Sequence, residues 1–146
     1  MNYKKQWTIL AISVISLQSF FINTAIADSA APAHVEAIKG SELSRVTLSE
    51  QAFKRIDIKT TQVQELASDG VAQKQKTIPY ASVLYDKHGK TWAYVKTKTR
   101  TFVRQSIGIV RIDGDQAILS NGPAIGTNVV TVGVAELFGS ETGIGH

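Results

Sequence analysis

Hydrophobic and polar positions alternate in short runs along the second half of the chain, which is typical of β-strands. Turn-forming residues separate these runs, and Asp113-Gly114 is the strongest hairpin sequence among them. The longest run contains Gly108, which predicts a bulge. The last run is the most continuously apolar, and it predicts a central strand. The predicted strands are 78–85, 91–95, 102–112, 116–119 and 128–132.

The first half of the chain predicts one short helix between two strands. Arg45–Leu48 has a strand pattern, and helical spacing of apolar residues follows it as far as about Arg55. Thr47 is the predicted N-cap of this helix, because Glu50 three residues later completes a capping box. Residues 56–63 then alternate with a period of two and predict the second strand. The expected buried stripe of the helix consists of Leu48, Ala52, Phe53 and Ile56.

Many short strands with one helix predict a mostly β fold, a small antiparallel β-roll or barrel of about six or seven strands. We expect the domain to cover residues 41–138, with a polar linker at 67–75 that contains a turn sequence. Residues 28–40 are rich in alanine and predict a flexible N-terminal arm. Residues 139–146 predict a loose C-terminal tail. In the predicted strand 91–95, even and odd positions face opposite sides of the sheet.

Residues 1–27 have the pattern of a cleavable export signal. Lys4 and Lys5 precede an apolar run, and Ala25 and Ala27 supply small residues at positions −3 and −1. We therefore expect cleavage after Ala27 and a mature protein in the periplasm. The alternative is a retained membrane anchor. No cysteine stands at the cleavage point, so the pattern does not indicate a bacterial lipid anchor.

Positive charge is concentrated between residues 74 and 104, where Asp86 is the only acidic residue. This distribution predicts a basic face that meets anionic headgroups or an acidic partner, because an exported protein rarely meets nucleic acid. The alternative is a solvated strand surface whose lysines prevent edge-to-edge pairing. The expected partner or membrane surface consists of Lys87, Lys90, Trp92, Tyr94, Lys96, Lys98, Arg100 and Arg104.

Catalytic and metal-binding patterns are lacking in the sequence. The chain has no cysteine, which excludes disulfides, thiolate metal sites and thiol catalysis. No pair among its three histidines has metal-ligand spacing, and no serine lies in a nucleophile motif. We therefore expect no enzyme, no metal site and no cofactor. An alternative function is a soluble periplasmic module that binds a metal or small ligand through His34, Glu36 or His146.

Three segments of the sequence share the pattern of one known family. Residues 78–84, IPYASVL, are similar to a V-P-x-x-A-V motif, and residues 122–133, GPAIGTNVVTVG, to a G-L-x-x-G-D-x-V-V-x-x-G motif. Residues 45–63 are similar to the short strand-helix-strand that precedes a lipoyl domain. In their chain order, 45–63, 78–84 and 122–133, the segments resemble the periplasmic adaptor subunits, or membrane fusion proteins, of resistance-nodulation-division (RND) efflux pumps. The resemblance covers most of the chain after residue 27.

The resemblance implies a stand-alone membrane-proximal domain of such an adaptor. The lipoyl domain, the α-helical hairpin and most of the β-barrel are missing, and residues 67–75 lie where these parts would be inserted. Pro123 and Thr127 replace the usual leucine and aspartate. The implied function is an accessory subunit in transmembrane export of a heavy metal or drug. The implied partner is an RND inner-membrane transporter, a full-length adaptor, or both, with possible contact to the inner membrane.

Two further inferences follow from this resemblance. The heavy-metal branch of the family binds metal through methionines, but the only methionine of this chain is Met1. Metal capture by that route is therefore not expected. A non-functional remnant of an adaptor gene is a third interpretation, against which the intact export signal and regular strand pattern argue.

Overall fold

The computed structural model describes residues 31–66 and 75–143. This part of the chain is mostly β, with eleven strands, two α-helices and one 3-10 turn. All strand pairs are antiparallel, as predicted, and neither sheet closes into a barrel. In chain order the elements are β1 (Ala33–Ala37), β2 (Ser44–Leu48), α1 (Glu50–Ile56), β3 (Lys59–Gln62), β4 (Gln64–Leu66), β5 (Gln75–Pro79), the 3-10 turn η1 (Tyr80–Ser82), β6 (Leu84–Tyr85), β7 (Thr91–Lys98), β8 (Thr101–Ser106), β9 (Gly108–Asp113), β10 (Gln116–Asn121), β11 (Asn128–Val132) and α2 (Val134–Thr142).

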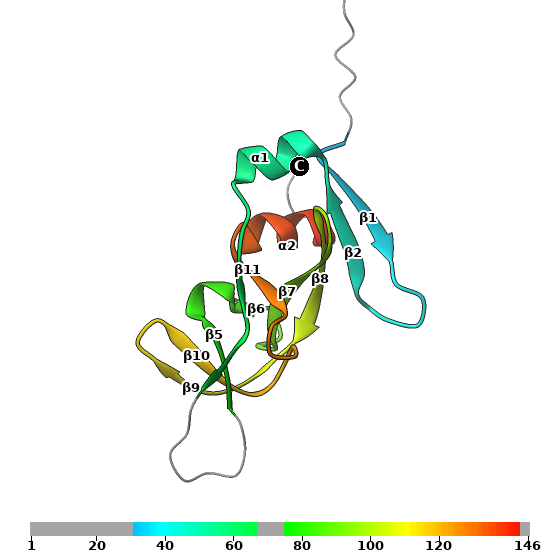
Figure 1. Cartoon of the computed structure of the whole chain (residues 1–146). Coiled ribbons are helices and arrows are strands. Elements are labelled where there is room, and N and C mark those ends of the chain that lie inside the picture. The colour runs from blue at the N-terminus through cyan, green and yellow to red at the C-terminus, as the bar shows by residue number, and fades with distance from the viewer. Residues whose placement is uncertain (1–30, 67–74, 144–146) are drawn as a thin grey trace, which may run out of the picture.

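The strands form two sheets, with both helices near one end of the larger one (Figure 1). The larger sheet has the order β1-β2-β8-β7-β11-β3, and β6 pairs with β7. The smaller sheet has the order β4-β5-β10-β9. The chain passes from one sheet to the other at Val63, which separates β3 from β4 and is 1% exposed. Val63 packs in a hydrophobic cluster that contains residues of both sheets, so it helps to hold the sheets together.

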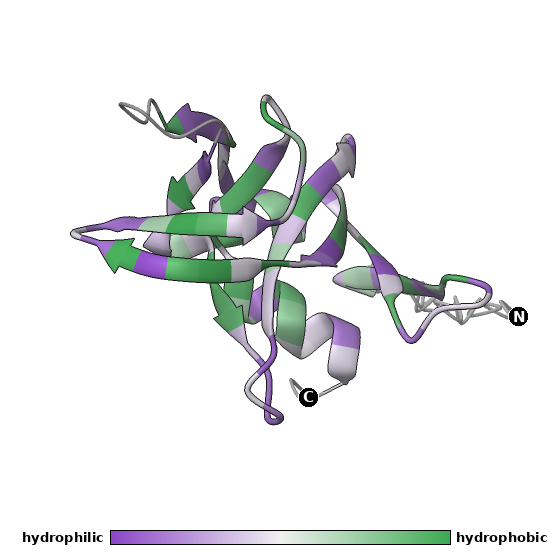
Figure 2. Cartoon of the chain, turned by 90° about the horizontal axis from the view of Figure 1, so that it is seen from below, coloured by the Kyte–Doolittle hydropathy of each residue, from purple (hydrophilic) through white to green (hydrophobic). Residues whose placement is uncertain are grey.

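Two hydrophobic cores lie on opposite faces of the larger sheet. Successive side chains of β7 point to opposite faces of the sheet. Tyr94 therefore joins one core, while Ala93 and Val95 join the other. Hydrophobic segments gather where the strands cross in the middle of the molecule (Figure 2). The helix-side core contains Val46, Leu48, Ala52, Ile58, Tyr94, Phe102, Val130 and Leu137. The sheet-side core contains Val63, Ile78, Ala93, Val95, Ile107, Ala117, Leu119 and Val129.

The predicted helix is present, but its predicted N-cap is wrong. Ser49 is the N-cap, and its Oγ accepts a hydrogen bond from the Ala52 amide at 3.1 Å. Thr47 instead lies inside β2, where its hydroxyl meets that of Thr101. β2 ends at Leu48, as predicted, and Thr47 is held in it by pairing with His34 of β1 and Thr101 of β8, so the helix starts two residues later than predicted. The predicted buried stripe of the helix is confirmed, since its members are buried or packed against the helix-side core.

Two predicted strands are each divided in the structure. The run 78–85 breaks after Pro79, because proline has no amide hydrogen to continue the ladder, and the 3-10 turn follows. The run 102–112 breaks at Ile107, where β8 leaves the larger sheet and β9 enters the smaller one. The β9–β10 ladder shifts register at Gly108, near the predicted bulge. The predicted hairpin follows Asp113, and β11 lies between β7 and β3 as a central strand, as predicted.

The predictions for the arm and tail are partly wrong. Residues 33–37 of the expected arm form β1, which pairs with β2 along its whole length. Residues 139–142 of the expected tail continue α2, which ends at Gly143 with a positive φ of 71°. The predicted export signal at 1–27 and almost all of the predicted linker 67–75 lie outside the described residues. The strands on either side of that linker are paired, with Leu66 opposite Gln75.

Candidate functional site

The expected basic surface does not form one continuous patch. Lys87 and Lys90 lie in the turn that precedes β7, whereas Lys96 and Lys98 lie at the far end of this strand. A strand rises about 3.3 Å per residue, so Lys90 and Lys96 are separated by roughly 20 Å. All four side chains are exposed. The structure therefore gives two separate lysine pairs, one at each end of β7.

Tyr94 is not part of any surface, so that prediction is wrong. Its side chain is fully buried in the helix-side core. The phenol donates a hydrogen bond of 2.5 Å to Glu141 Oε2 on α2. Burial, followed by this hydrogen bond, raises the pKa of Tyr94 far above its ordinary value. The phenol therefore stays protonated and serves as a permanent donor to the carboxylate.

Arg104 is also used inside the molecule. Its Nε donates to Glu141 Oε1 at 2.9 Å, and the two side chains are only 14% and 3% exposed. The guanidinium carbon lies 4.6 Å from the centre of the Trp92 ring and 5.7 Å from that of Phe138. Such stacking on aromatic faces stabilises a desolvated cation. We therefore correct the prediction for Arg104, because this cation joins α2 to the larger sheet and is not offered to a membrane or partner.

Trp92 holds the turn that carries the first lysine pair. Its indole nitrogen donates to Asp86 Oδ2 at 3.0 Å. The other oxygen of Asp86 accepts hydrogen bonds from the amides of His88 and Lys90, at 2.8 and 2.9 Å. The tryptophan is half-buried, so only part of the ring could contact a partner. Its main structural role is to fix the Asp86 turn against the sheet.

The Asp86 turn gives a pH-dependent prediction. The hydrogen bond from Trp92 is the main cause that lowers the pKa of Asp86 below its ordinary value. The ionised carboxylate of Asp86 therefore stabilises the fold fully above the pKa of about 3.9 that this group has in the unfolded chain. This stabilisation is lost as pH falls through the lower pKa that Asp86 has in the folded protein. Trp92 is the only tryptophan after residue 27. In a chain that begins at Asp28, we expect its fluorescence to change with a midpoint below about 3.9. Asp86→Asn is expected to remove this transition, while Asp113→Asn leaves it unchanged.

The second lysine pair lies beside Arg100 at the β7–β8 turn. Arg100 has a positive φ of 56°, is half-buried, and places Nη1 3.7 Å from Glu50 Oε2. Its Nε is buried without a hydrogen-bond partner. Lys96 and Lys98, in contrast, make no ion pair with any described residue. Among the expected residues at this end of the sheet, these two lysines are therefore the most available to a partner.

The residues of the alternative metal site are only partly described. His34 and Glu36 lie on β1, and the Glu36 carboxylate is 2.7 Å from Arg45 Nη1. His146 lies outside the described residues. In residues 31–66 and 75–143, no group of three or more His, Asp or Glu side chains is placed to hold a metal ion.

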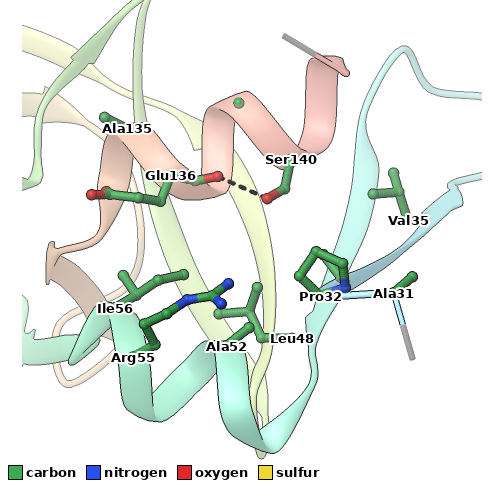
Figure 3. Close-up of a pocket in the computed structure, with 12 residues that line it drawn as sticks. Ala31, Pro32, Val35, Leu48, Ala52, Arg55, Ile56, Ala135, Glu136 and Ser140 are labelled. Atoms are coloured by element: carbon green, nitrogen blue, oxygen red, sulfur yellow. Dashed lines mark hydrogen bonds between the residues drawn. The ribbon is translucent and has the colours of Figure 1, made fainter. Parts of the chain in front are cut away.

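A groove between the two helices and the β1–β2 hairpin was not foreseen from the sequence (Figure 3). It has a volume of about 670 Å³ and mostly small or apolar walls. The sequence offered one signal for its α2 wall, because Gly143 is a typical residue after a helix C-terminus. The groove is lined by Ala31, Pro32, Ala33, Val35, Leu48, Ala52, Arg55, Ile56, Ala135, Glu136, Gly139 and Ser140.

Comparisons with known proteins identify no relative: no protein-family model, curated protein or solved structure matches this chain. Neither α1 nor α2, the helices of the described part, has the length and apolar character needed to cross a membrane. The candidate sites are therefore judged from their own geometry. They are the lysine pair at the β7–β8 turn and the groove between the helices.

Proposed function

We propose that this chain is an accessory, adaptor-like periplasmic subunit of an RND tripartite efflux system. It docks on the inner-membrane transporter or on a full-length adaptor and takes part in the export of a heavy metal or drug. The observation that carries the proposal is the ordered resemblance of residues 45–63, 78–84 and 122–133 to the adaptor family. The export signal predicted at residues 1–27 gives the corresponding location.

The pairing of the two strands that flank residues 67–74 supports the proposal. Full adaptors carry their lipoyl and hairpin domains at the position of residues 67–75. Here β4 and β5, on either side of this position, are neighbours in one antiparallel sheet. A short connection between them therefore suffices, and no inserted domain is needed to bring the flanking strands together.

The segments that carry the resemblance also pack on each other. β3 belongs to the first segment and pairs with β11 of the last segment. The amide of Val63 donates to the carbonyl of Thr127, and the amide of Gly126 donates to the carbonyl of Val63, both at 2.9 Å. The parts that flank the missing domains thus form one continuous unit, which is what an independently folded membrane-proximal domain requires.

The exposed lysines of the β7–β8 turn provide a test of docking. The double substitution Lys96→Glu and Lys98→Glu is expected to lower association with the pump or membrane several-fold at low salt, because it reverses two exposed charges. Lys87→Glu and Lys90→Glu make the same charge change at the other end of β7 and serve as the matched control. Co-purification from cell envelopes at low and high salt measures the effect. Equal recovery of partner with both double variants would contradict docking through this turn.

The partner itself is found by affinity purification. A C-terminally tagged chain is recovered from crosslinked cell envelopes, and the proteins that accompany it are identified by mass spectrometry. Recovery of an RND transporter or of a full-length adaptor supports the accessory-subunit proposal and names the substrate class. A monomer in the soluble periplasmic fraction, with no pump peptides, contradicts it.

A soluble ligand-binding module is the second candidate function, and the groove between the helices favours it. Binding through His34 or Glu36 is less supported, because the carboxylate of Glu36 is already paired with Arg45. Calorimetric titration with copper, zinc and silver distinguishes a metal-binding module from an accessory subunit. Tight stoichiometric metal binding would favour the metal-binding form of this module over an accessory subunit.

A further inference from the structure

The groove between α1, α2 and the β1–β2 hairpin has the properties of a small-ligand site. Its volume of about 670 Å³ lies within the range of about 300–1,000 Å³ that such sites span. Leu48 and Ala52, which are only 2% exposed, form its base and connect it to the helix-side core. Pro32 and Val35 line its strand side (Figure 3). An apolar chain in this groove would therefore rest on ordered core residues.

One cation points into this apolar space. Arg55 lies in the last turn of α1, and its side chain extends into the groove toward Leu48 (Figure 3). The described residues give its guanidinium no ion pair and no hydrogen bond. The preceding residue, Lys54, is different, because its ammonium is 2.6 Å from Glu50 Oε1 on the exposed side of the helix. Arg55 is thus a free cation at the groove, on a helix whose other basic group is already paired.

The acidic groups nearby do not neutralise Arg55. The Glu136 side chain of α2 lines the groove, but its carboxylate points away from the guanidinium (Figure 3). Glu50, the acid of α1, is engaged by Lys54 and lies 3.7 Å from Arg100. The groove therefore combines a mostly apolar lining with the exposed guanidinium of Arg55, which is unpaired among the described residues, and the carboxylate of Glu136 lies apart from it. The complementary ligand is an amphiphile that has one apolar chain and one anionic head.

We propose that this groove binds a fatty carboxylate. The acyl chain lies over Leu48, Ala52 and Ile56, and the carboxylate accepts paired hydrogen bonds from the Arg55 guanidinium. A planar guanidinium and a carboxylate match in this fork geometry, and hydrogen bonds between charged groups are the strong ones. The proposal goes beyond the docking function, because it assigns a ligand to a surface that docking through the β7–β8 turn does not use.

The test is calorimetric titration of the purified chain with sodium dodecanoate below its micelle concentration. We expect saturable binding of one ligand per chain. Arg55→Gln is expected to raise the Kd at least about tenfold, because it removes the charged hydrogen bonds to the head. Lys54→Gln, which removes the same charge from the adjacent position, is expected to leave the Kd unchanged. Dodecyltrimethylammonium, with the same tail and a positive head, is expected not to bind at this site.

A second variant blocks the groove without touching the charge. Val35 is 39% exposed on β1, where a tryptophan is tolerated in a strand and fills the rim of the groove. Val35→Trp is expected to abolish binding, with circular dichroism as the check on folding. Binding that survives in Val35→Trp, or an unchanged Kd in Arg55→Gln, overturns the proposal. So does the absence of saturable binding, which is also the result if another part of the chain fills the groove. None of these results depends on pump association, so the two proposals can fail separately.

Discussion

Replacement of Glu141 by alanine is expected to lower the free energy of unfolding by about 3–5 kcal/mol. The substitution leaves the Arg104 guanidinium, which is 14% exposed, without its counter-ion. It also leaves the buried phenol of Tyr94 and the amide of Ser44 without their acceptor. A domain of this size is stable by only about 5–15 kcal/mol, so a large share of the stability is lost. Urea denaturation followed by circular dichroism measures the change.

The control for this experiment is Glu136→Ala, on the same helix. Glu136 is exposed and its carboxylate makes no ion pair with a described residue, so its loss is expected to change stability by less than about 0.5 kcal/mol. Glu141→Gln separates charge from hydrogen bonding, because the amide oxygen can still accept from Tyr94 while the charge of Arg104 stays unpaired. Equal stability of the two alanine variants would show that the buried ion pair contributes nothing to the fold.

Gly133→Ala is expected to destabilise the protein by about 3 kcal/mol, from backbone strain and overpacking together. Gly133 has a positive φ of 96° at the junction of β11 and α2. A Cβ atom at this position would overlap Cδ1 of Ile58 and lie 2.8 Å from Cγ2 of Ile56. Ile58 belongs to the helix-side core and has little room to move. Thermal and urea denaturation of the variant measure the cost.

The matched control is Gly126→Ala, which isolates the cost of the backbone. Gly126 also has a positive φ, 84°, but a Cβ atom there would meet nothing within 4 Å. This control is expected to lose only about 1 kcal/mol, from the left-handed conformation alone. Ile58→Val removes the Cδ1 atom and should return part of the stability when it is combined with Gly133→Ala. If the two alanine variants lose the same stability, the predicted clash is absent.

The sequence predicted the strands well where both faces of a strand are buried. In β7, Tyr94 joins one core, and Ala93 and Val95 join the other, as the period-two pattern predicts. The apolar pattern of β11 likewise matched its central position. Element boundaries were predicted less well. The N-cap was placed at Thr47 instead of Ser49, because no local pattern shows that Thr47 pairs with His34 of β1 and Thr101 of β8 and therefore stays in the strand.

The candidate surface was harder to predict, because charge alone does not show where a side chain points. Arg104 and Tyr94 are both used by Glu141, which is 37 and 47 residues away in sequence. No local pattern connects residues at such separations. Lys96 and Lys98 are exposed whereas Arg104 is largely buried, and the strand register decides this difference. The groove was missed because the sequence analysis predicted only one helix, whereas the wall of the groove is formed by a second helix, α2, part of which lies in the expected tail.

The pairing of β4 with β5 has an evolutionary consequence. A site where two adjacent strands already meet can accept or lose a whole module while the rest of the domain keeps its contacts, because only the connecting segment changes. The entropic cost of lengthening such a segment is small, about 0.6 kcal/mol for each doubling of its length. The position between the paired residues Leu66 and Gln75 is therefore one at which this domain is expected to tolerate insertion. Connecting segments of very different length there are compatible with the same core.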